Sequence, residues 1–249
     1  MPRRPRVAIH HLPHHLIQRG HRRNAVFCSD SDRVDYLGTL SECRAMLGLR
    51  VYAYCLMDNH VHLLIDPRDD ASNLSVLMKR LAGRHTRRLN TARGWSGSLW
   101  ESRFKCSPID SEVYLLTCGR YIDQNPVRAR IVKSPEDYRW SSYRARAGHI
   151  ESQVLDLDPA LEALSSNANR RFEIYRMLTS IAVPDSDLCL IRGASQRNQL
   201  TGDDHFLDFV RTEHSLDIPA RKQGRPRKQP RQKEGAPLDA PSRNIDLPL

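Results

Sequence analysis

The sequence predicts an α+β fold in which helices pack on an antiparallel sheet. Short runs rich in β-branched and aromatic residues predict strands, and longer runs with apolar residues every three or four positions predict helices. Their predicted order along the chain is strand, helix, strand, strand, helix, strand. This order is typical of the ferredoxin-like split βαβ arrangement, which has helices on one face of the sheet and leaves the other face open.

The first strand and the first helix are predicted between residues 13 and 47. A strand over 13–19 can be closed by Gly20. A helix is expected from Asp32 to Leu47, because residues 30–32 supply capping side chains and Gly48 can end it. The apolar residues of this helix follow helical spacing and are expected to face the core: Val34, Leu37, Leu40, Cys43 and Leu47.

A central hairpin is predicted next, with strands over 51–57 and 60–66 and a turn at Asp58-Asn59. Side chains alternate along a strand, so His60 and His62 share one face with their Cα atoms roughly 6–7 Å apart. Two imidazoles on one face can bind a metal ion, although an edge strand with two surface histidines is the alternative. Two ligands rarely suffice, so a third ligand has to come from elsewhere in the chain.

The second half of the sheet domain is predicted over residues 72–107. Ser72 is expected to cap a helix over 73–90, whose core residues are Leu74, Leu77, Met78, Leu81 and His85. Its outer face carries Lys79, Arg80, Arg84, Arg87 and Arg88 and no acidic residue. Such a face suits nucleic acid, although it can also be merely solvated. A fourth strand is expected over 98–107, with Arg103 and Lys105 on one face.

A third helix is predicted to start at Asp110 or Ser111 and to end at Asn125, because Pro126 follows. Tyr121 and Asn125 are four residues apart and would share one helix face, roughly 6 Å apart. If that face meets the two histidines, the amide oxygen of Asn125 can be the third metal ligand and Tyr121 lies beside the metal. Otherwise Tyr121 is a packed aromatic residue and Asn125 a helix C-cap.

The composition favours an anionic partner. The 249 residues include 39 Lys and Arg against 29 Asp and Glu, a net charge of +10. This excess fits nucleic acid better than a membrane surface. Further DNA contacts are expected from residues in basic stretches: Arg19, Arg22, Arg23 and Arg128. No apolar run is long enough to span a bilayer, and the six cysteines show no CxxC pair, so we expect free thiols and a cytoplasmic location.

These residues predict phosphodiester chemistry. A divalent cation held by His60, His62 and Asn125 would polarise a phosphate and offset the charge that grows in the transition state. Attack by the Tyr121 phenolate on phosphorus would give a covalent phosphotyrosine and release a hydroxyl, so the break can be reversed. Phosphate chemistry and an amide ligand favour Mg²⁺ or Mn²⁺, while imidazoles also suit softer ions.

Several motifs resemble those of HUH nucleases with a single catalytic tyrosine, the single-strand transposases, and in particular the REP-associated tyrosine transposases. They are Leu12–His15 with Gln18–Gly20, Met57–Leu64, Leu99–Phe104, Arg120–Ala129 and Trp140–Tyr143. The resemblance covers about residues 6–145. It implies that His60, His62 and Asn125 bind Mg²⁺ or Mn²⁺ and that Tyr121 forms a 5′-phosphotyrosine. It also implies a single-stranded or hairpin DNA substrate from a palindromic repeat, and a protein that acts as a homodimer or a monomer.

Three domains are expected: a nuclease domain over 1–150, a helical appendage over 151–218 and a basic disordered tail over 219–249. Within the tail, residues 223–228 resemble an AT-hook core, with a generic basic tail as the alternative.

The leading functional prediction is a metal-dependent transposase or endonuclease that cleaves and rejoins single-stranded DNA. One alternative is a catalytically silent protein that binds DNA hairpins. Another is a metal-dependent hydrolase of small molecules, which would need more carboxylate ligands than Asp58 and Asp66 supply and leaves the basic charge unexplained.

Overall fold

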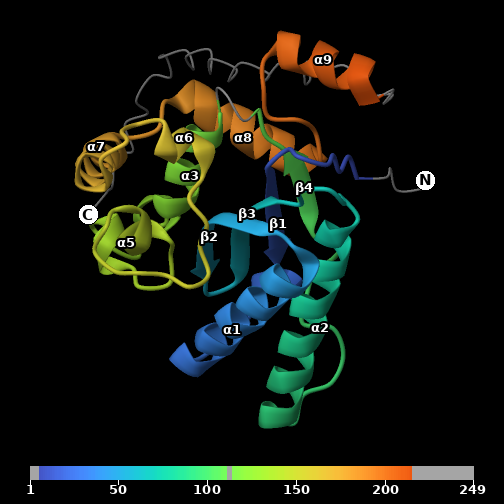
Figure 1. The fold of residues 1–249 in the computed structure, drawn as a ribbon. Coiled ribbons are helices and arrows are strands. Elements are labelled where there is room, and N and C mark those ends of the chain that lie inside the picture. The colour runs from blue at the N-terminus through green and yellow to red at the C-terminus, as the bar shows by residue number, and fades with distance from the viewer. Residues whose placement is uncertain (1–5, 111–113, 215–249) are drawn as a thin grey trace, which may run out of the picture. The chain divides into compact units, whose positions relative to one another are not determined.

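A four-stranded antiparallel sheet is the centre of the fold (Figure 1). The computed structural model describes residues 6–110 and 114–214. The strands are β1 (His14–Arg19), β2 (Arg50–Met57), β3 (His60–Asp66) and β4 (Lys105–Pro108), in the order β2-β3-β1-β4. The predicted α+β class and the predicted hairpin are confirmed. The predicted tail over 219–249 lies outside the described residues.

Helices α1 (Asp30–Leu47) and α2 (Asn73–Arg93) pack on each other and cover one face of the sheet (Figure 1). Alternate residues of β3 are fully buried, as predicted: Val61, Leu63 and Ile65. The predicted core residues of α2 are also all buried, but Ser72 forms no side-chain cap and the helix runs on to Arg93. Gly94 ends it with a left-handed φ of 64°, a conformation that glycine adopts without strain.

The N-terminus of α1 differs from the prediction. Ser29 is the cap, and its hydroxyl and the Asp32 carboxylate form a reciprocal capping box. Val34 is 57% exposed and does not face the core. Tyr36 is buried instead, and its ring packs edge-on against Phe27, with centroids 5.3 Å apart.

The fourth strand is shorter than predicted. Ile17 pairs with Lys105, and the carbonyl oxygen of Arg19 accepts a hydrogen bond from the Glu101 amide at 2.9 Å. The segment Ser102–Phe104 therefore bulges out opposite the single residue Gln18. Bulges of this kind redirect side chains and are frequent next to functional sites.

The other face of the sheet is not open. Helix α3 (Leu115–Asp123) contacts β2 and β3, and α8 (Asp185–Arg197) contacts β4 and β1. Helix α3 ends before Asn125, and a second short helix, α4 (Asn125–Arg128), follows at once. Pro126 lies in the first turn of α4, where its missing N–H is not needed, so it begins a helix and does not stop one. Ser111, one of the two residues predicted to cap the third helix, lies outside the described residues.

The remaining helices are short or C-terminal: η1 (His21–Arg23), η2 (Pro135–Asp137), α5 (Tyr143–Arg146), α6 (Pro159–Glu162), α7 (Ala168–Ser180) and α9 (Asp204–His214). A buried network joins α5, α7 and the N-cap of α6 to α3. Tyr175 of α7 donates to Asp123 at 2.5 Å, and Arg146 donates to Asp158 at 2.5 Å and to the Tyr175 hydroxyl at 3.0 Å. The predicted domain boundaries stay a prediction.

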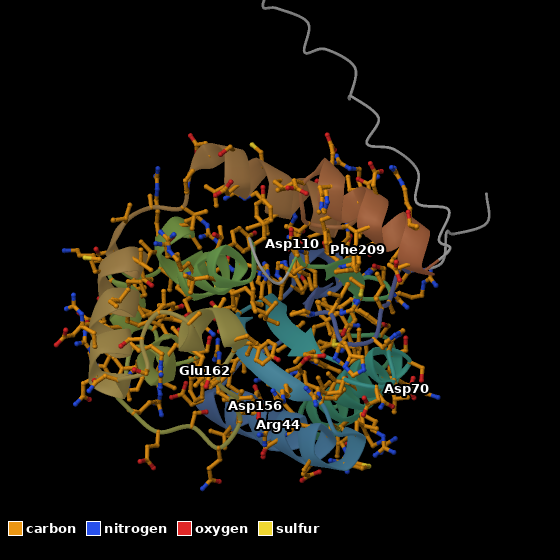
Figure 2. All side chains as sticks on the ribbon, turned by 45° about the horizontal axis from the view of Figure 1, so that its top comes forward. Arg44, Asp70, Asp110, Asp156, Glu162 and Phe209 are labelled. Atoms are coloured by element: carbon orange, nitrogen blue, oxygen red, sulfur yellow. The ribbon has the colours of Figure 1, made fainter. Side chains whose placement is uncertain are left out.

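Asp156 accepts a hydrogen bond from Arg44 of α1 at 2.5 Å, and Figure 2 labels both residues. This contact ties the segment before α6 to the sheet domain. In the described part of the chain, no helix combines the length and the apolar character needed to cross a membrane.

Candidate metal and nucleophile site

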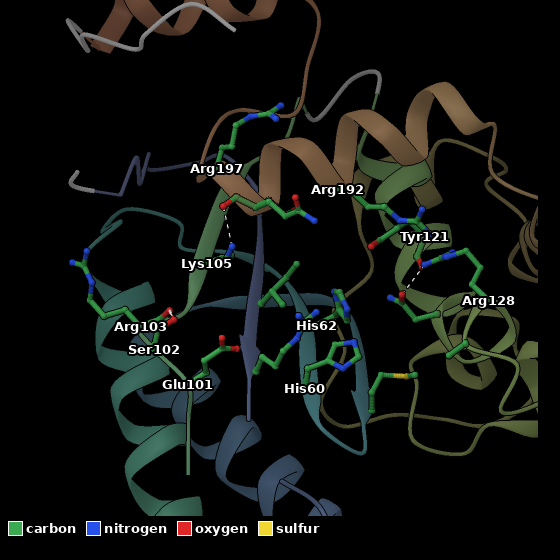
Figure 3. A pocket seen from close by; sticks show the side chains of 17 residues that line it. His60, His62, Glu101, Ser102, Arg103, Lys105, Tyr121, Arg128, Arg192 and Arg197 are labelled. Atoms are coloured by element: carbon green, nitrogen blue, oxygen red, sulfur yellow. Dashed lines mark hydrogen bonds between the residues drawn. The ribbon is translucent and has the colours of Figure 1, made fainter. Parts of the chain in front are cut away.

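A cleft of about 830 Å³ lies on the sheet face that α3 and α8 cover. Its lining includes His60, His62, Tyr121 and Asn125, so the structure brings together all four predicted residues. Figure 3 shows Tyr121 and Arg128 across the cleft from Glu101, with the two histidines between them. The rings of His60 and His62 are 5.0 Å apart, which places both imidazoles within reach of one ion.

His60 presents its Nε2 atom as a free acceptor. The Nδ2 atom of Asn59 donates to the carbonyl oxygen of Arg23 at 3.1 Å, which fixes the orientation of the amide. Asn59 Oδ1 therefore faces His60 Nδ1, at 2.6 Å. A carboxamide oxygen can only accept, so Nδ1 carries the proton and the lone pair of His60 lies on Nε2. This is the tautomer that binds a metal through Nε2.

His62 is 4% exposed and has a buried partner. Its Nδ1 atom lies 2.8 Å from Nε2 of His15, a residue of β1. Because Nδ1 is engaged, Nε2 is the atom of His62 that remains for a metal.

Both histidines are held in the neutral form. Burial, with a smaller effect of Arg19, lowers the pKa of His60 to about 4. Burial, with smaller effects of His15 and His60, lowers the pKa of His62 well below its ordinary value. Metal binding requires the neutral imidazole, so near pH 7 no proton has to leave either ring before it binds a metal.

Tyr121 lies at the edge of this pair. Its ring centroid is 5.9 Å from that of His62 in an edge-on arrangement, and the residue is 6% exposed at the wall of the cleft. The guanidinium carbon of Arg128 lies 4.1 Å from the Tyr121 ring centroid. The phenol is therefore next to the imidazoles and a cation, and is not buried among aliphatic side chains far from them.

Asn125 and Arg128 are joined by a hydrogen bond. Arg128 Nη2 donates at 2.7 Å both to Asn125 Oδ1 and to the carbonyl oxygen of Tyr121. Asn125 Nδ2 and Arg128 Nη1 are buried donors without a partner. Two such donors in a cleft fit an anion such as a phosphate oxygen, because a buried donor without an acceptor is costly.

The donor set fits a divalent cation that also binds phosphate. It comprises two imidazole Nε2 atoms and the second lone pair of Asn125 Oδ1, and substrate oxygens would complete the coordination. Among the described residues, no group of three or more His, Cys, Asp or Glu side chains is arranged to hold a metal ion.

The predicted DNA-binding residues fall into two groups. Those that line the cleft are Arg19, Arg103, Lys105 and Arg128. Those that lie elsewhere are Arg22, Arg23, Lys79, Arg80, Arg84 and Arg87, the last four on α2. The α2 face lacks acids of its own, but Arg84 pairs with Glu42 of α1. Their contact with DNA stays a prediction.

Sequence reasoning missed part of the cleft wall. The bulge contributes Ser102, the residue before the bulge is Glu101, and α8 contributes Arg192, Ser195, Gln196 and Arg197. The residues Pro184–Asp187 are a recognisable helix start, with proline followed by acidic residues, and could have predicted α8. Nothing local predicted that this helix would lie over the sheet.

A family model described as "Transposase IS200 like" matches residues 8–125. This segment belongs to the IS200-like transposase family. The family comprises HUH tyrosine nucleases that depend on a divalent metal. The matched residues include both histidines of the cleft, Tyr121 and, as the last residue, Asn125. Helix α8 lies beyond the family match.

Two solved structures are similar to this chain. A REP-associated tyrosine transposase bound to a REP hairpin aligns with a TM-score of 0.48 and 18% identity, over 63% of this chain and 95% of that chain. A candidate transposase from Deinococcus radiodurans R1 aligns with a TM-score of 0.32 and 25% identity, over 49% of this chain and 97% of that chain. No curated protein matches this chain.

Proposed function

We propose that this IS200-like transposase cleaves and rejoins single-stranded DNA through a 5′-phosphotyrosine on Tyr121. The observation that carries the proposal is the shared cleft of Tyr121, His60, His62 and Asn125, with the Tyr121 ring 5.9 Å from that of His62. The family match, which spans all four residues, supports it. We propose that the tyrosine acts in the subunit that carries its histidines, because a single chain brings all four residues to one cleft.

The metal ligands in this proposal are His60 Nε2, His62 Nε2 and Asn125 Oδ1. The ion is Mg²⁺ or Mn²⁺, because oxygen-rich coordination with a phosphate suits both. When bound, it polarises the scissile phosphate and offsets the charge that develops there.

Tyr121 supplies the nucleophile. Its phenol loses a proton, the phenolic oxygen forms a bond to phosphorus, and the bond from phosphorus to the 3′ oxygen breaks. The departing 3′ oxygen takes up a proton and becomes a hydroxyl. Attack of a 3′-hydroxyl on the same phosphorus reverses the step, which joins the strand and frees Tyr121.

The basic cleft binds the DNA backbone. Arg19, Arg103, Lys105 and Arg128 line it together with Arg192 and Arg197 of α8. Cationic side chains around a cleft attract phosphates and give salt-dependent affinity. The hairpin form of the substrate, from a palindromic repeat, rests on the motif resemblance.

A labelled hairpin oligonucleotide incubated with the protein and Mn²⁺ tests the proposal on a denaturing gel. A protein–DNA band that disappears with EDTA and in Tyr121→Phe is expected. Salt-sensitive hairpin binding without such a band in the wild type would instead indicate a catalytically silent DNA-binding protein.

A further inference from the structure

His62 lies at the end of a buried chain of hydrogen bonds that begins on α8. The Oγ atom of Ser195 lies 3.0 Å from Nδ1 of His15, and Nε2 of His15 lies 2.8 Å from Nδ1 of His62. Ser195 is separated from His15 by 180 residues in sequence. Through His15, these hydrogen bonds join a helix beyond the family match to His62, a ligand in the proposed metal site.

The sheet places His15 and His62 on the same face. His15 pairs with Leu64, and His62 pairs with Ile17, so the two histidines are diagonal neighbours on adjacent strands. Their ring centroids are 5.1 Å apart and their ring planes are inclined by only 20°, which fits an in-plane hydrogen bond between ring nitrogens. The ring of Tyr121 meets that of His15 edge-on at 5.7 Å.

The residues joined by these hydrogen bonds are buried, so the loss of any one bond would cost free energy. His15 is 0% exposed and Ser195 is 1% exposed. Water cannot replace a lost partner there, and an unpaired buried polar atom costs free energy. We therefore expect that, in each of these hydrogen bonds, one of the two joined atoms carries a proton and its partner atom accepts it.

The hydrogen bonds between Ser195, His15 and His62 can be donated in two directions, and only one of them leaves His62 able to bind a metal through Nε2. In that direction His15 donates from Nδ1 to Ser195, and His15 Nε2 accepts from His62 Nδ1–H. The opposite direction puts a proton on His62 Nε2 and blocks its lone pair.

The position of Ser195 is fixed by contacts around it. The carbonyl oxygen of Gln196 accepts from Lys105 Nζ at 2.9 Å, and Asn198 Oδ1 accepts from the Cys106 amide at 3.0 Å. These two bonds attach the C-terminal end of α8 to β4, which is the neighbour of β1 in the sheet. Helix α8 therefore holds the hydroxyl against His15.

We propose that His15 and Ser195 are positioning residues, which fix the tautomer and the orientation of His62 as a metal ligand. This inference rests on the proposed metal site. Partners behind a metal-bound histidine commonly change metal affinity by about 10- to 100-fold. Residues 185–197 would thus belong to the metal site, although they lie outside the segment shared with the family.

The first test measures Mn²⁺ affinity of the full chain by calorimetry. His15→Leu should weaken binding about 10- to 100-fold, and Ser195→Ala should weaken it by about 10-fold or less. His15→Gln should restore most of the affinity, because its amide oxygen can accept from His62 Nδ1–H.

Matched controls separate positioning from folding. His14→Leu removes a neighbouring buried imidazole, which accepts from the Ile9 amide at 3.1 Å and does not touch His62. Ser186→Ala makes the same change as Ser195→Ala on an exposed part of α8. Both should keep wild-type affinity. Equal affinity in wild type, His15→Leu and Ser195→Ala would overturn the proposal, as would weakening in His14→Leu as large as in His15→Leu.

A second test needs no metal. Long-range ¹H–¹⁵N spectra of ¹⁵N-histidine-labelled protein report which ring nitrogen carries the proton. His62 is expected as the Nδ1–H tautomer in the wild type and as a mixture in Ser195→Ala. Finding the Nε2–H tautomer in the wild type would overturn the proposal whatever the protein does to DNA. If the tautomer and the Mn²⁺ affinities are as expected but no DNA adduct forms, the proposed reaction is refuted and the positioning role of His15 and Ser195 is not.

Discussion

Replacing Arg128 by methionine is expected to slow formation of the Tyr121–DNA adduct about 100- to 1,000-fold at saturating DNA. The guanidinium already holds the carbonyl oxygen of Tyr121 and the amide of Asn125, each at 2.7 Å, and lies 4.1 Å from the Tyr121 ring centroid. Its Nη1 atom is buried without a partner. We expect Nη1 to donate to the scissile phosphate.

The magnitude follows from the number of donors lost. One preorganised donor to a developing anion contributes about 3–4 kcal/mol, which corresponds to the stated change in rate. Arg128→Lys should recover only part of the rate. A lysine ammonium cannot reproduce the planar guanidinium, which donates to the oxygens of Tyr121 and Asn125 and is expected to donate a third hydrogen bond to the phosphate.

The assay is single-turnover adduct formation on a labelled oligonucleotide with Mn²⁺. Arg139→Met is the control, because Arg139 pairs with Asp30 at 3.0 Å and does not line the cleft. Thermal melting of each variant shows whether it is folded. An Arg128→Met protein that melts like the wild type and forms adduct within threefold of its rate would refute the reasoning.

Three further predictions follow from the fold. Arg103→Ala should weaken DNA binding and lower its salt dependence, because Arg103 lines the cleft. Arg84→Ala should weaken filter-binding affinity less, because Arg84 lies outside this cleft and pairs with Glu42. Ser29→Ala should lower the free energy of unfolding by about 1 kcal/mol in urea titrations, through loss of the α1 cap. Burial lowers the pKa of His14 to about 4, so its neutral form is favoured in the folded state. The free energy of unfolding should therefore fall as pH drops from 6.5 towards 4. Between pH 7.5 and pH 5.0, urea titrations should show that the free energy of unfolding of His14→Gln decreases by about 2 kcal/mol less than that of the wild type.

The parts of the site that were predicted depend on local sequence. His60 and His62 share a face because a strand alternates its side chains, and Tyr121 and Asn125 share a face because they are one helical turn apart. Both relations survive in the structure, even though a break at Gln124 separates α3 from α4. Short-range periodicity therefore paired the two histidines with each other and Tyr121 with Asn125, and the motif resemblance assigned both pairs to one site.

The parts that were missed depend on contacts between distant segments. The bulge at Ser102–Phe104 arises from pairing with β1, and the burial of Ser195 arises from packing of α8 on the sheet. The adjacent histidines His14 and His15 lie on opposite faces of β1, and this gives them different roles. His14 binds backbone atoms of its own loop, and His15 binds His62.

The central claim is that Tyr121 becomes covalently attached to DNA. Protease digestion of the protein–DNA adduct, followed by mass spectrometry, locates the residue that carries the nucleotide. The account predicts a 5′-nucleotide on the peptide that contains Tyr121 and on no other peptide. A nucleotide on a different residue, or hairpin DNA that is cut without any covalent protein species, would contradict it.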